Sequence, residues 1–406
     1  MRKPAPARAA PHPATVRPTM KSLGQRASGE RLERMQASPR WWRPSDEGPG
    51  QARAGFRNLH PIPPGLRDPT AKFPTLRDFL CADGRRVPAG PLPALNPLDT
   101  WRKPAGSGLR ATWLGHSTVL IEIDGLRVLT DPVWGARASP LRLAGPKRFQ
   151  PVPVPVKALP PLDLVLVSHD HYDHLDHPTI RELLKRQPQV PYVTSLGVGA
   201  HLQAWGVLPE RIVELDWWEQ YTLPHADLSV HAAPSQHFSG RGLKDRNATL
   251  WSSLVLQSPR QRVFFSGDTG LTTEYAAIRE RYGPFDLVML EVGAFHPAWG
   301  DIHLGPENAL EALALLGGGA FLPVHWGTFA LAMHDWDEPA ETLLALGPKQ
   351  GARLLMPRLG EGVEPGHEVA LTPWWRAAGG RARAAEVASP QPEPQALKRA
   401  VPWPLD

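Results

Sequence analysis

The stretch VSHDHYDHLD, residues 167–176, places three histidines and three aspartates directly after the largely apolar run LDLVLV of residues 162–167. The apolar run predicts a buried strand, so the polar residues follow the point where that strand ends. Two interpretations are open at this point: a polar surface loop, or a metal site built at the end of a strand. The rest of the chain has to supply further ligands if the second interpretation is correct.

Within this stretch, the spacing of the ligand candidates separates them into two pairs. While the chain stays extended, alternate side chains share one face, so His169 and His171 point in the same direction. Asp173 and His174 follow, where the chain turns toward a helix predicted over residues 177–187. We therefore expect one segment to present two pairs in different directions, which suits two metal ions better than one.

Three further ligand candidates follow predicted strands elsewhere in the chain: His237, Asp268 and His325. Because Cys81 is the single cysteine, histidine and carboxylate must supply the ligands of any metal site. A lone histidine after a strand is more often a hydrogen-bonded structural residue, and an aspartate between glycines is usually a turn residue. Their combination with an H-x-H-x-D-H motif, in the required chain order, favours a metal site over these alternatives.

Composition and charge narrow the class of protein. With 406 residues, 42% of them apolar, the chain can build a substantial core, and no run of about 18 apolar residues predicts a membrane span. The net charge of +5 is concentrated in the N-terminal tail and around residues 376–383, which favours solvation or weak attraction to anionic lipid over specific nucleic-acid binding. The basic N-terminus lacks the apolar segment of a secretory signal, while an Arg-rich transit segment stays open. We expect a cytoplasmic location, with peripheral membrane association as an extension of it.

The chain divides into two low-complexity tails and one domain. Residues 1–55 and 376–406 are rich in small residues, proline and arginine and lack periodicity, so we expect them to be disordered. Residues 56–375 alternate strand and helix patterns, which predicts a single α/β domain with two sheets flanked by helices. The predicted strands are 112–114, 118–123, 128–130, 162–168, 228–232, 250–257, 262–266, 287–290 and 321–324. The predicted helices are 177–187, 198–205, 273–281 and 306–316.

Longer strings outside the histidine motif carry a family resemblance. They include WLGHST (113–118), GPKRF (145–149), FFSGDTG (264–270) and HWGTFAL (325–331), within a stretch from Asn58 to Gly362. The H-x-H-x-D-H motif alone is typical of the metallo-β-lactamase fold hydrolases. With these strings the chain resembles, within that superfamily, the N-acyl-phosphatidylethanolamine-hydrolysing phospholipases D.

The resemblance implies a four-layer αββα sandwich with a dinuclear zinc site between its two sheets. By motif position it implies a first zinc held by His169, His171 and His237, a second held by Asp173, His174 and His325, and Asp268 as the bridge between them. Iron or manganese would suit the same ligand types. The implied reaction is attack of a metal-bridging hydroxide on the phosphorus of an N-acyl-phosphatidylethanolamine, which yields phosphatidic acid and an N-acylethanolamine.

The resemblance also suggests catalytic roles. Asp173 and Asp268 are the expected catalytic carboxylates, because the first can accept the proton of the attacking water and the second bridges the metals. His303 matches a family histidine near the substrate phosphate, which implies substrate binding or proton transfer; capping of the helix that starts at Pro306 is the structural alternative. His116 is interpreted as a supporting or structural residue and not as a ligand.

The segment 297–303 departs from the family, because it is shorter and lacks an arginine and the bulky or basic residues usual there. Those positions lie near the substrate entrance in the family, so the departure bears on substrate selectivity. The alternative function is hydrolysis of another ester, such as a lactone or a sugar-phosphate lactone. A non-enzymatic lipid- or nucleic-acid-binding module is disfavoured, since all seven ligand positions are filled. The expected partners are a phospholipid substrate, a membrane surface contacted peripherally and, by family inference, a second copy of the chain in a homodimer.

Overall fold

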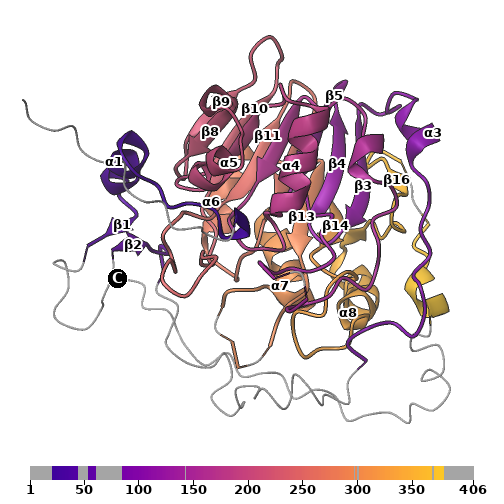
Figure 1. Ribbon diagram of the computed structural model, residues 1–406. Coiled ribbons are helices and arrows are strands. Elements are labelled where there is room, and N and C mark those ends of the chain that lie inside the picture. Colours follow the sequence, from indigo (N-terminus) through magenta and orange to yellow (C-terminus); the bar gives the residue numbers. More distant parts are fainter. Residues whose placement is uncertain are drawn as a thin grey trace, which may run out of the picture.

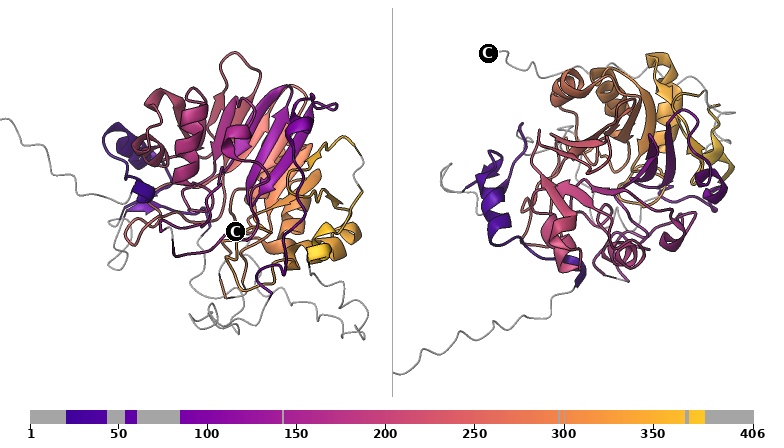
Figure 2. Two further views of the ribbon diagram at one scale, coloured as in Figure 1. Left: turned by 45° about the vertical axis from the view of Figure 1, so that its right-hand side comes forward. Right: turned by 90° about the horizontal axis from the view of Figure 1, so that it is seen from above.

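The computed structural model describes residues 21–43, 54–60 and 85–378, apart from residues 142, 297, 300, 368 and 369. Within these ranges, two sheets of seven strands each form the centre of the molecule. The sheets face one another, and helices lie on the outer side of each (Figure 1 and Figure 2). The expected four-layer αββα sandwich is confirmed.

The first sheet has the strand order β16-β3-β4-β5-β6-β7-β8. Its strands are β3 (Leu109–Gly115), β4 (Thr118–Ile123), β5 (Leu126–Thr130), β6 (Leu164–Val167), β7 (Tyr192–Ser195), β8 (Ile212–Leu215) and β16 (Gly362–Val363). Strands β16 to β5 pair antiparallel, and strands β5 to β8 pair parallel. The β4–β5 hairpin turns at Asp124 and Gly125, whose φ angles of 46° and 86° suit a two-residue type I′ turn.

The second sheet has the order β15-β14-β13-β12-β11-β10-β9. Its strands are β9 (Gln220–Thr222), β10 (Ser229–Ala233), β11 (Ser253–Gln257), β12 (Arg262–Phe265), β13 (Leu287–Glu291), β14 (Ala320–Val324) and β15 (Arg353–Leu354). Strands β9 to β12 pair antiparallel, and strands β12 to β15 pair parallel. In both sheets the parallel strands therefore bring the segments that follow them to one edge.

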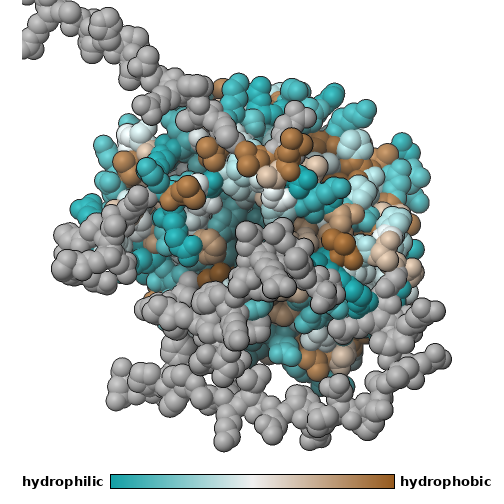
Figure 3. Space-filling view, turned by 60° about the horizontal axis from the view of Figure 1, so that its bottom comes forward, coloured by the Kyte–Doolittle hydropathy of each residue, from teal (hydrophilic) through white to brown (hydrophobic). Residues whose placement is uncertain are grey.

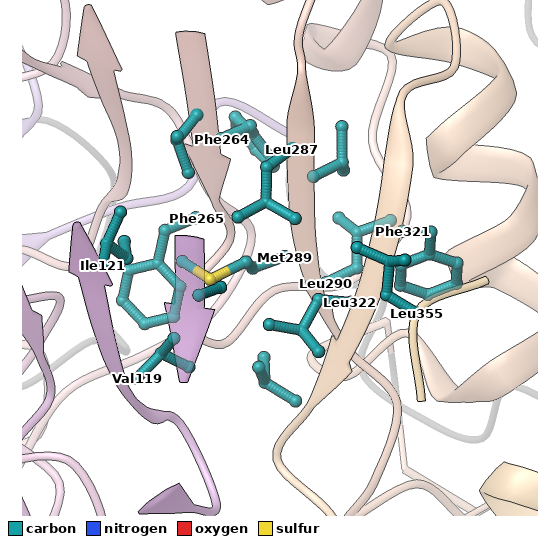
Figure 4. Close-up of a cluster of buried hydrophobic side chains, with 14 of the residues drawn as sticks. Val119, Ile121, Phe264, Phe265, Leu287, Met289, Leu290, Phe321, Leu322 and Leu355 are labelled. Atoms are coloured by element: carbon teal, nitrogen blue, oxygen red, sulfur yellow. The ribbon is translucent and has the colours of Figure 1, made fainter. Parts of the chain in front are cut away.

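The core between the sheets is built by alternate side chains of the strands. In β4, Val119 and Ile121 belong to the cluster shared by both sheets, whereas Leu120 between them belongs to the cluster under the helices of the first sheet. Figure 4 shows Val119 and Ile121 beside Phe265 and Met289 of the second sheet. All five side chains are at most 1% exposed, and burial of each stabilises the fold by about 1.5–3 kcal/mol.

Helices cover the outer face of each sheet (Figure 1). The helices are α3 (Leu98–Trp101), α4 (His177–Arg186), α5 (Gly199–Ala204), α6 (Glu274–Tyr282), α7 (Gly305–Leu315) and α8 (Glu338–Leu346). Helix α4 starts directly after the histidine-rich segment, and the carboxylate of Asp176 caps it by accepting a hydrogen bond from the Thr179 N–H at 3.2 Å. The four predicted helices agree with α4 to α7 within one residue at each end. None of the helices in the described ranges is long and apolar enough to cross a membrane.

The expectation of disorder over residues 1–55 is wrong for residues 21–43 and 54–55. This part contains the 3₁₀ helix η1 (Lys21–Leu23), helix α1 (Glu30–Ala37) and strand β1 (Trp41–Trp42), which pairs with β2 (Gly55–Phe56). We call residues 21–43 and 54–60 the N-terminal strap. Its few apolar residues are enough to order it, because Met35 and Phe56 pack into a small core with Trp217 and Trp251 and are at most 2% exposed. Residues 1–20 and 44–53 of the expected tail lie outside the described residues.

At the other end, the described chain runs three residues past the expected domain boundary at residue 375. The 3₁₀ helix η6 (Trp374–Ala378) buries Trp374 and Trp375. The guanidinium of Arg376 pairs with the Glu341 carboxylate of α8 at 2.6 Å. Residues 379–406 of the expected C-terminal tail lie outside the described residues.

Candidate metal centre

The seven predicted ligands meet at one edge of the sandwich. They come from the segments after four strands: His169, His171, Asp173 and His174 after β6, His237 after β10, Asp268 after β12, and His325 after β14. Five of the seven residues are at most 3% exposed, and the side chain of Asp173 is 13% exposed. The structure thus brings together all residues that the sequence predicts, from both sheets.

A first cluster contains His169, His171, His237 and Asp268, whose candidate ligand atoms lie within 4.8 Å of one another. His171 Nδ1 is 2.9 Å from His169 Nε2 and 3.2 Å from His237 Nε2. Asp268 Oδ2 lies 3.8 Å from His169 Nε2 and 3.6 Å from His237 Nε2. Three imidazole nitrogens and one carboxylate oxygen around a common point form a donor set suited to a divalent transition metal.

A second cluster contains Asp173, His174 and His325, together with His116. The other oxygen of Asp268, Oδ1, lies 3.1 Å from His174 Nε2 and 3.2 Å from His325 Nε2. Asp173 Oδ2 lies 3.0 Å from His116 Nε2 and 3.3 Å from His325 Nε2. Asp268 therefore directs one oxygen to each cluster, which suits a carboxylate that bridges two metal ions, while its role as a ligand stays a prediction.

Buried polar atoms test whether a metal fits these clusters. His174 Nε2 and Asp268 Oδ1 are inaccessible to solvent, yet neither makes a hydrogen bond to any described residue, although they lie 3.1 Å apart. Buried polar groups are nearly always satisfied, and a cation between the two atoms would satisfy both. The two clusters thus suggest a dinuclear metal site.

Asp131, which the sequence analysis did not single out, orients one ligand of each cluster. It follows β5 and is fully buried. Its Oδ2 accepts hydrogen bonds from His174 Nδ1 at 2.6 Å and from the Ser168 hydroxyl at 2.7 Å. That hydroxyl lies 2.9 Å from His169 Nδ1 and can accept its proton. Both rings are thereby held with Nε2 as the atom left for metal binding.

Burial and the neighbouring carboxylates shift the pKa values of the histidines in opposite directions. Burial holds the pKa of His169 and His237 well below the usual value near 6.5. Burial alone would also lower the pKa of His325, but the carboxylates of Asp268 and Asp173 raise it to about 10. In the metal-free centre His325 therefore carries a proton at neutral pH, and metal binding has to release it.

His303 lies at the border of both clusters. Its Nδ1 donates a hydrogen bond to Glu291 Oε1 at 3.1 Å and is 3.9 Å from Asp268 Oδ2. Glu291 is fully buried at the end of β13, and its Oε1 also accepts the backbone N–H of Leu304 at 2.7 Å. The alternative role of His303 is capping of α7, but the N-cap residue of α7 is Leu304. Glu291 thus fixes the orientation of the His303 ring; only its place at the end of an apolar strand could have pointed to it from the sequence.

The loop after β13 contacts His334, which lies in the segment after β14. The backbone N–H of Ala294 donates to His334 Nε2 at 3.1 Å, and His334 Nδ1 donates to the backbone carbonyl of Asp335 at 2.8 Å. The ring stacks on Phe295 at 4.5 Å between centroids. Burial lowers the pKa of His334 to about 4, so the ring is neutral at pH 7 and its Nε2 can accept the Ala294 hydrogen bond.

Comparisons with known proteins agree with this geometry. A family model described as a beta-lactamase superfamily domain matches residues 126–326. An uncharacterised protein of Mycobacterium tuberculosis is 44% identical over 335 residues, which are 82% of this chain and 88% of that protein. The N-acyl-phosphatidylethanolamine-hydrolyzing phospholipase D 1 of Caenorhabditis elegans is 37% identical over 249 residues, 59% of this chain and 70% of that protein.

Among solved structures, an isothiocyanate hydrolase from Delia radicum gut bacteria matches with a TM-score of 0.51 at 22% identity, over 63% of this chain and 98% of that chain. This likeness shows the fold alone. The fold, the two His/Asp clusters and the sequence relatives lead to one conclusion: the chain belongs to the metallo-β-lactamase superfamily of hydrolases.

Proposed function

We propose that the protein is a phosphodiesterase of the phospholipase D type. Its substrates would be N-acyl-phosphatidylethanolamine-like phospholipids, and its products phosphatidic acid and an N-acylethanolamine. The observation that carries the proposal is the pair of His/Asp clusters joined by Asp268, with His303 beside them. The similarity to the phospholipase D of Caenorhabditis elegans supports the choice of substrate.

We propose zinc as the metal, held by His169, His171 and His237 on one side, by Asp173, His174 and His325 on the other, and by Asp268 between them. Neutral imidazole and carboxylate are ligand types that zinc accepts readily, although iron or manganese would suit them too. Two divalent ions would lower the pKa of water and offset negative charge on the phosphate oxygens.

The side chains around the metals would handle the protons. Asp173 accepts the proton of the attacking water, and His116, 3.0 Å from Asp173 Oδ2, holds that carboxylate in place. His303 binds the substrate phosphate or gives a proton to the departing ethanolamine oxygen, with its ring oriented by Glu291. The bond from water to phosphorus forms as the bond from phosphorus to that oxygen breaks.

We further propose that the protein works at a membrane surface from the cytoplasmic side. Three leucines on two loops support this: Leu141 is 48%, Leu143 is 92% and Leu243 is 102% exposed. Strap residue Ser22 joins the loops, because its hydroxyl donates to the Pro140 carbonyl and its carbonyl accepts from the buried guanidinium of Arg241, which precedes Leu243 by two residues.

Exposed cations lie on the same loops and on the adjoining strap: Lys21, Arg26, Lys147, Lys244 and Arg246. Apolar side chains framed by cations favour contact with anionic lipid. Figure 3 shows apolar side chains among hydrophilic ones on one face of the molecule. A homodimer remains a proposal from the family resemblance.

The test is a substrate panel. Zinc-loaded protein is incubated with N-acyl-phosphatidylethanolamine, with plain phosphatidylethanolamine and with a set of lactones, and the products are identified by mass spectrometry. Phosphatidic acid from the N-acyl lipid would support the proposal. Turnover of lactones without release of phosphatidic acid from either phospholipid would refute it in favour of the alternative ester hydrolase.

A further inference from the structure

We propose that the N-terminal strap positions the ligands of the metal centre, and that Asn58 is the positioning residue of His237. The strap lies outside residues 126–326, the part that matches the family model. One of its hydrogen-bonded contacts is nevertheless made directly to a ligand, and two others reach the segment that carries further ligands through the side chains of Arg241 and His201. The proposal rests on the metal centre and not on the choice of substrate.

Asn58 holds both backbone polar groups of His237. Its Nδ2 donates to the His237 carbonyl at 2.9 Å, and its Oδ1 accepts the His237 N–H at 3.0 Å. The same Oδ1 accepts the indole N–H of Trp251 at 3.0 Å, so a flip of the amide group would lose these hydrogen bonds. This pairing fixes the backbone of one ligand in the way that a neighbouring strand would.

The ring of His237 is held separately. Its Nδ1 donates to the carbonyl of Ile302 at 2.7 Å, which leaves Nε2 as the atom directed at Asp268 and His171. With Ile302 fixing the ring and Asn58 fixing the backbone, His237 has little freedom of position. Removing the amide of Asn58 would release the backbone while the ring contact remains.

A second contact runs through Arg241, whose side chain is buried beneath the strap. Its Nη1 donates to the carbonyls of Asp170 at 2.5 Å and Leu175 at 2.9 Å, the residues on either side of the ligands 171–174. Its Nη2 donates to the carbonyl of Ser22 in the strap at 2.8 Å. The strap therefore supplies one of the acceptors that keep this buried cation satisfied.

A third contact runs through His201 of α5. The backbone N–H of Gln25 donates to His201 Nδ1 at 3.0 Å, so His201 Nε2 carries the proton that it shares with Asp170 Oδ2 at 3.3 Å. The other oxygen of Asp170 accepts the Gly240 N–H at 2.8 Å. The strap thus selects the tautomer of a histidine that anchors Asp170, the residue between two ligands.

The strap is attached strongly enough to serve as such a support. Met35 fills its small core, and the indole N–H of Trp205 donates to the Lys21 carbonyl at 2.7 Å. Arg31 pairs with Glu214 at 2.5 Å, where the side chains are 20% and 9% exposed. By contrast, the Arg34–Glu219 pair is about half exposed on both sides and contributes little.

These contacts predict different effects on the two metals. Asn58 contacts a ligand of the first cluster only, whereas Arg241 and His201 hold the segment that carries ligands of both clusters. Loss of the Asn58 amide should therefore loosen one metal ion. Disturbance of the strap at Gly24 should loosen both, because a side chain there would clash with the His201 ring and meet a φ angle of +75°.

The experiment measures Zn²⁺ binding to the metal-free full chain in competition with a chromophoric chelator. For Asn58→Ala we expect one of two equivalents to bind about 10- to 100-fold more weakly, while the other keeps wild-type affinity. For Gly24→Val we expect both to weaken. The matched control Arg34→Ala lies in the strap away from the ligands and should bind both as the wild type does.

Asn58→Asp serves if Asn58→Ala does not fold, because it keeps the shape and the acceptor while removing the donor to the His237 carbonyl. We expect it to weaken the same equivalent. Folded Asn58 variants that bind both equivalents normally would overturn the proposal, and so would equal weakening of both equivalents in them. Since no substrate is used, the result is independent of whether the phospholipid assay succeeds.

Discussion

Replacing Asp131 with asparagine should weaken both metal ions while the fold is kept. The substitution is close to isosteric, but it turns one acceptor oxygen into a donor. Asp131 Oδ1 accepts the backbone N–H of Ser168 at 2.7 Å, and Oδ2 accepts His174 Nδ1 and the Ser168 hydroxyl. Because Ser168 also contacts His169, the substitution reaches one ligand in each cluster.

The expected loss of metal affinity follows from the two orientations that the amide of the introduced asparagine can take. With its nitrogen at the Oδ2 position, it opposes the Nδ1 proton of His174 and drives that proton to Nε2, the metal-binding atom. With its nitrogen at the Oδ1 position, it opposes the buried N–H of Ser168, which costs about 1–3 kcal/mol. Since 1.4 kcal/mol is about tenfold in an equilibrium constant, we expect metal affinity to fall roughly 10- to 100-fold, the range typical of residues that orient metal ligands.

The assay is chelator competition with Zn²⁺, with unfolding by urea in the presence of EDTA as the check on the fold. Asp163→Asn is the matched control: Asp163 Oδ2 accepts the Arg127 N–H at 2.8 Å just before β6, at the end of the strand away from the ligands. It removes a carboxylate that, like Asp131, accepts a backbone N–H, without touching the centre. Wild-type affinity for both equivalents in Asp131→Asn would show that the reasoning about His174 and His169 is wrong.

Three further changes have defined outcomes. Asp268→Asn should lose metal and phosphodiesterase activity together, as measured by elemental analysis and product formation; full activity with one bound metal would contradict the bridging role. His334→Gln should flatten the pH dependence of stability. The folded wild type keeps His334 neutral down to a pKa of about 4, while the unfolded histidine titrates near 6.5, so stability falls by up to about 3 kcal/mol as the pH drops between these values. Urea unfolding of both metal-free proteins at pH 7 and pH 5 measures the difference; equal slopes would refute it. Leu143→Asp combined with Leu243→Asp should reduce sedimentation with anionic vesicles about tenfold or more and leave cleavage of a soluble short-chain substrate unchanged; unaltered sedimentation would rule out this membrane contact.

The metal ligands could be predicted because their chemistry is local. Four of them lie within six residues after one apolar strand, and the other three each follow a strand of the second sheet. The layers around the ligands could also be predicted. The central strands are apolar on both faces, which indicates that each sheet is covered on both sides. Helices α4 and α7 carry clear signals: Asp176 and Pro178 mark the start of α4, Pro306 is at the second position of α7, and the Gly317–Gly319 run follows α7.

The edge strands of the sheets and the strap could not be predicted, because their positions depend on contacts with distant parts of the chain. The sequence does not predict the edge strands β8, β9, β15 and β16 or the inner strand β7, and the predicted strand 250–257 begins only at Ser253. Two of these strands, β15 and β16, are two residues long, and β9 has an exposed or half-buried side chain at every position. The strap depends on Met35 and Phe56 inserting beside tryptophans that lie far along the chain. No periodicity within residues 21–43 reveals that contact, because the partner surface belongs to another part of the fold.

The supporting residues show why a ligand motif does not fix the properties of a metal site. Asp131 reaches a ligand in each cluster from β5, and Asn58 reaches one ligand in one cluster from a strap outside the matched domain. If geometry at the ligands sets metal affinity, the two variants must differ in the number of Zn²⁺ equivalents whose binding they weaken. Asp131→Asn should weaken the binding of two equivalents and Asn58→Ala the binding of one. A general loss of stability would weaken both equivalents in both variants, so the pattern separates positioning of the ligands from destabilisation of the fold.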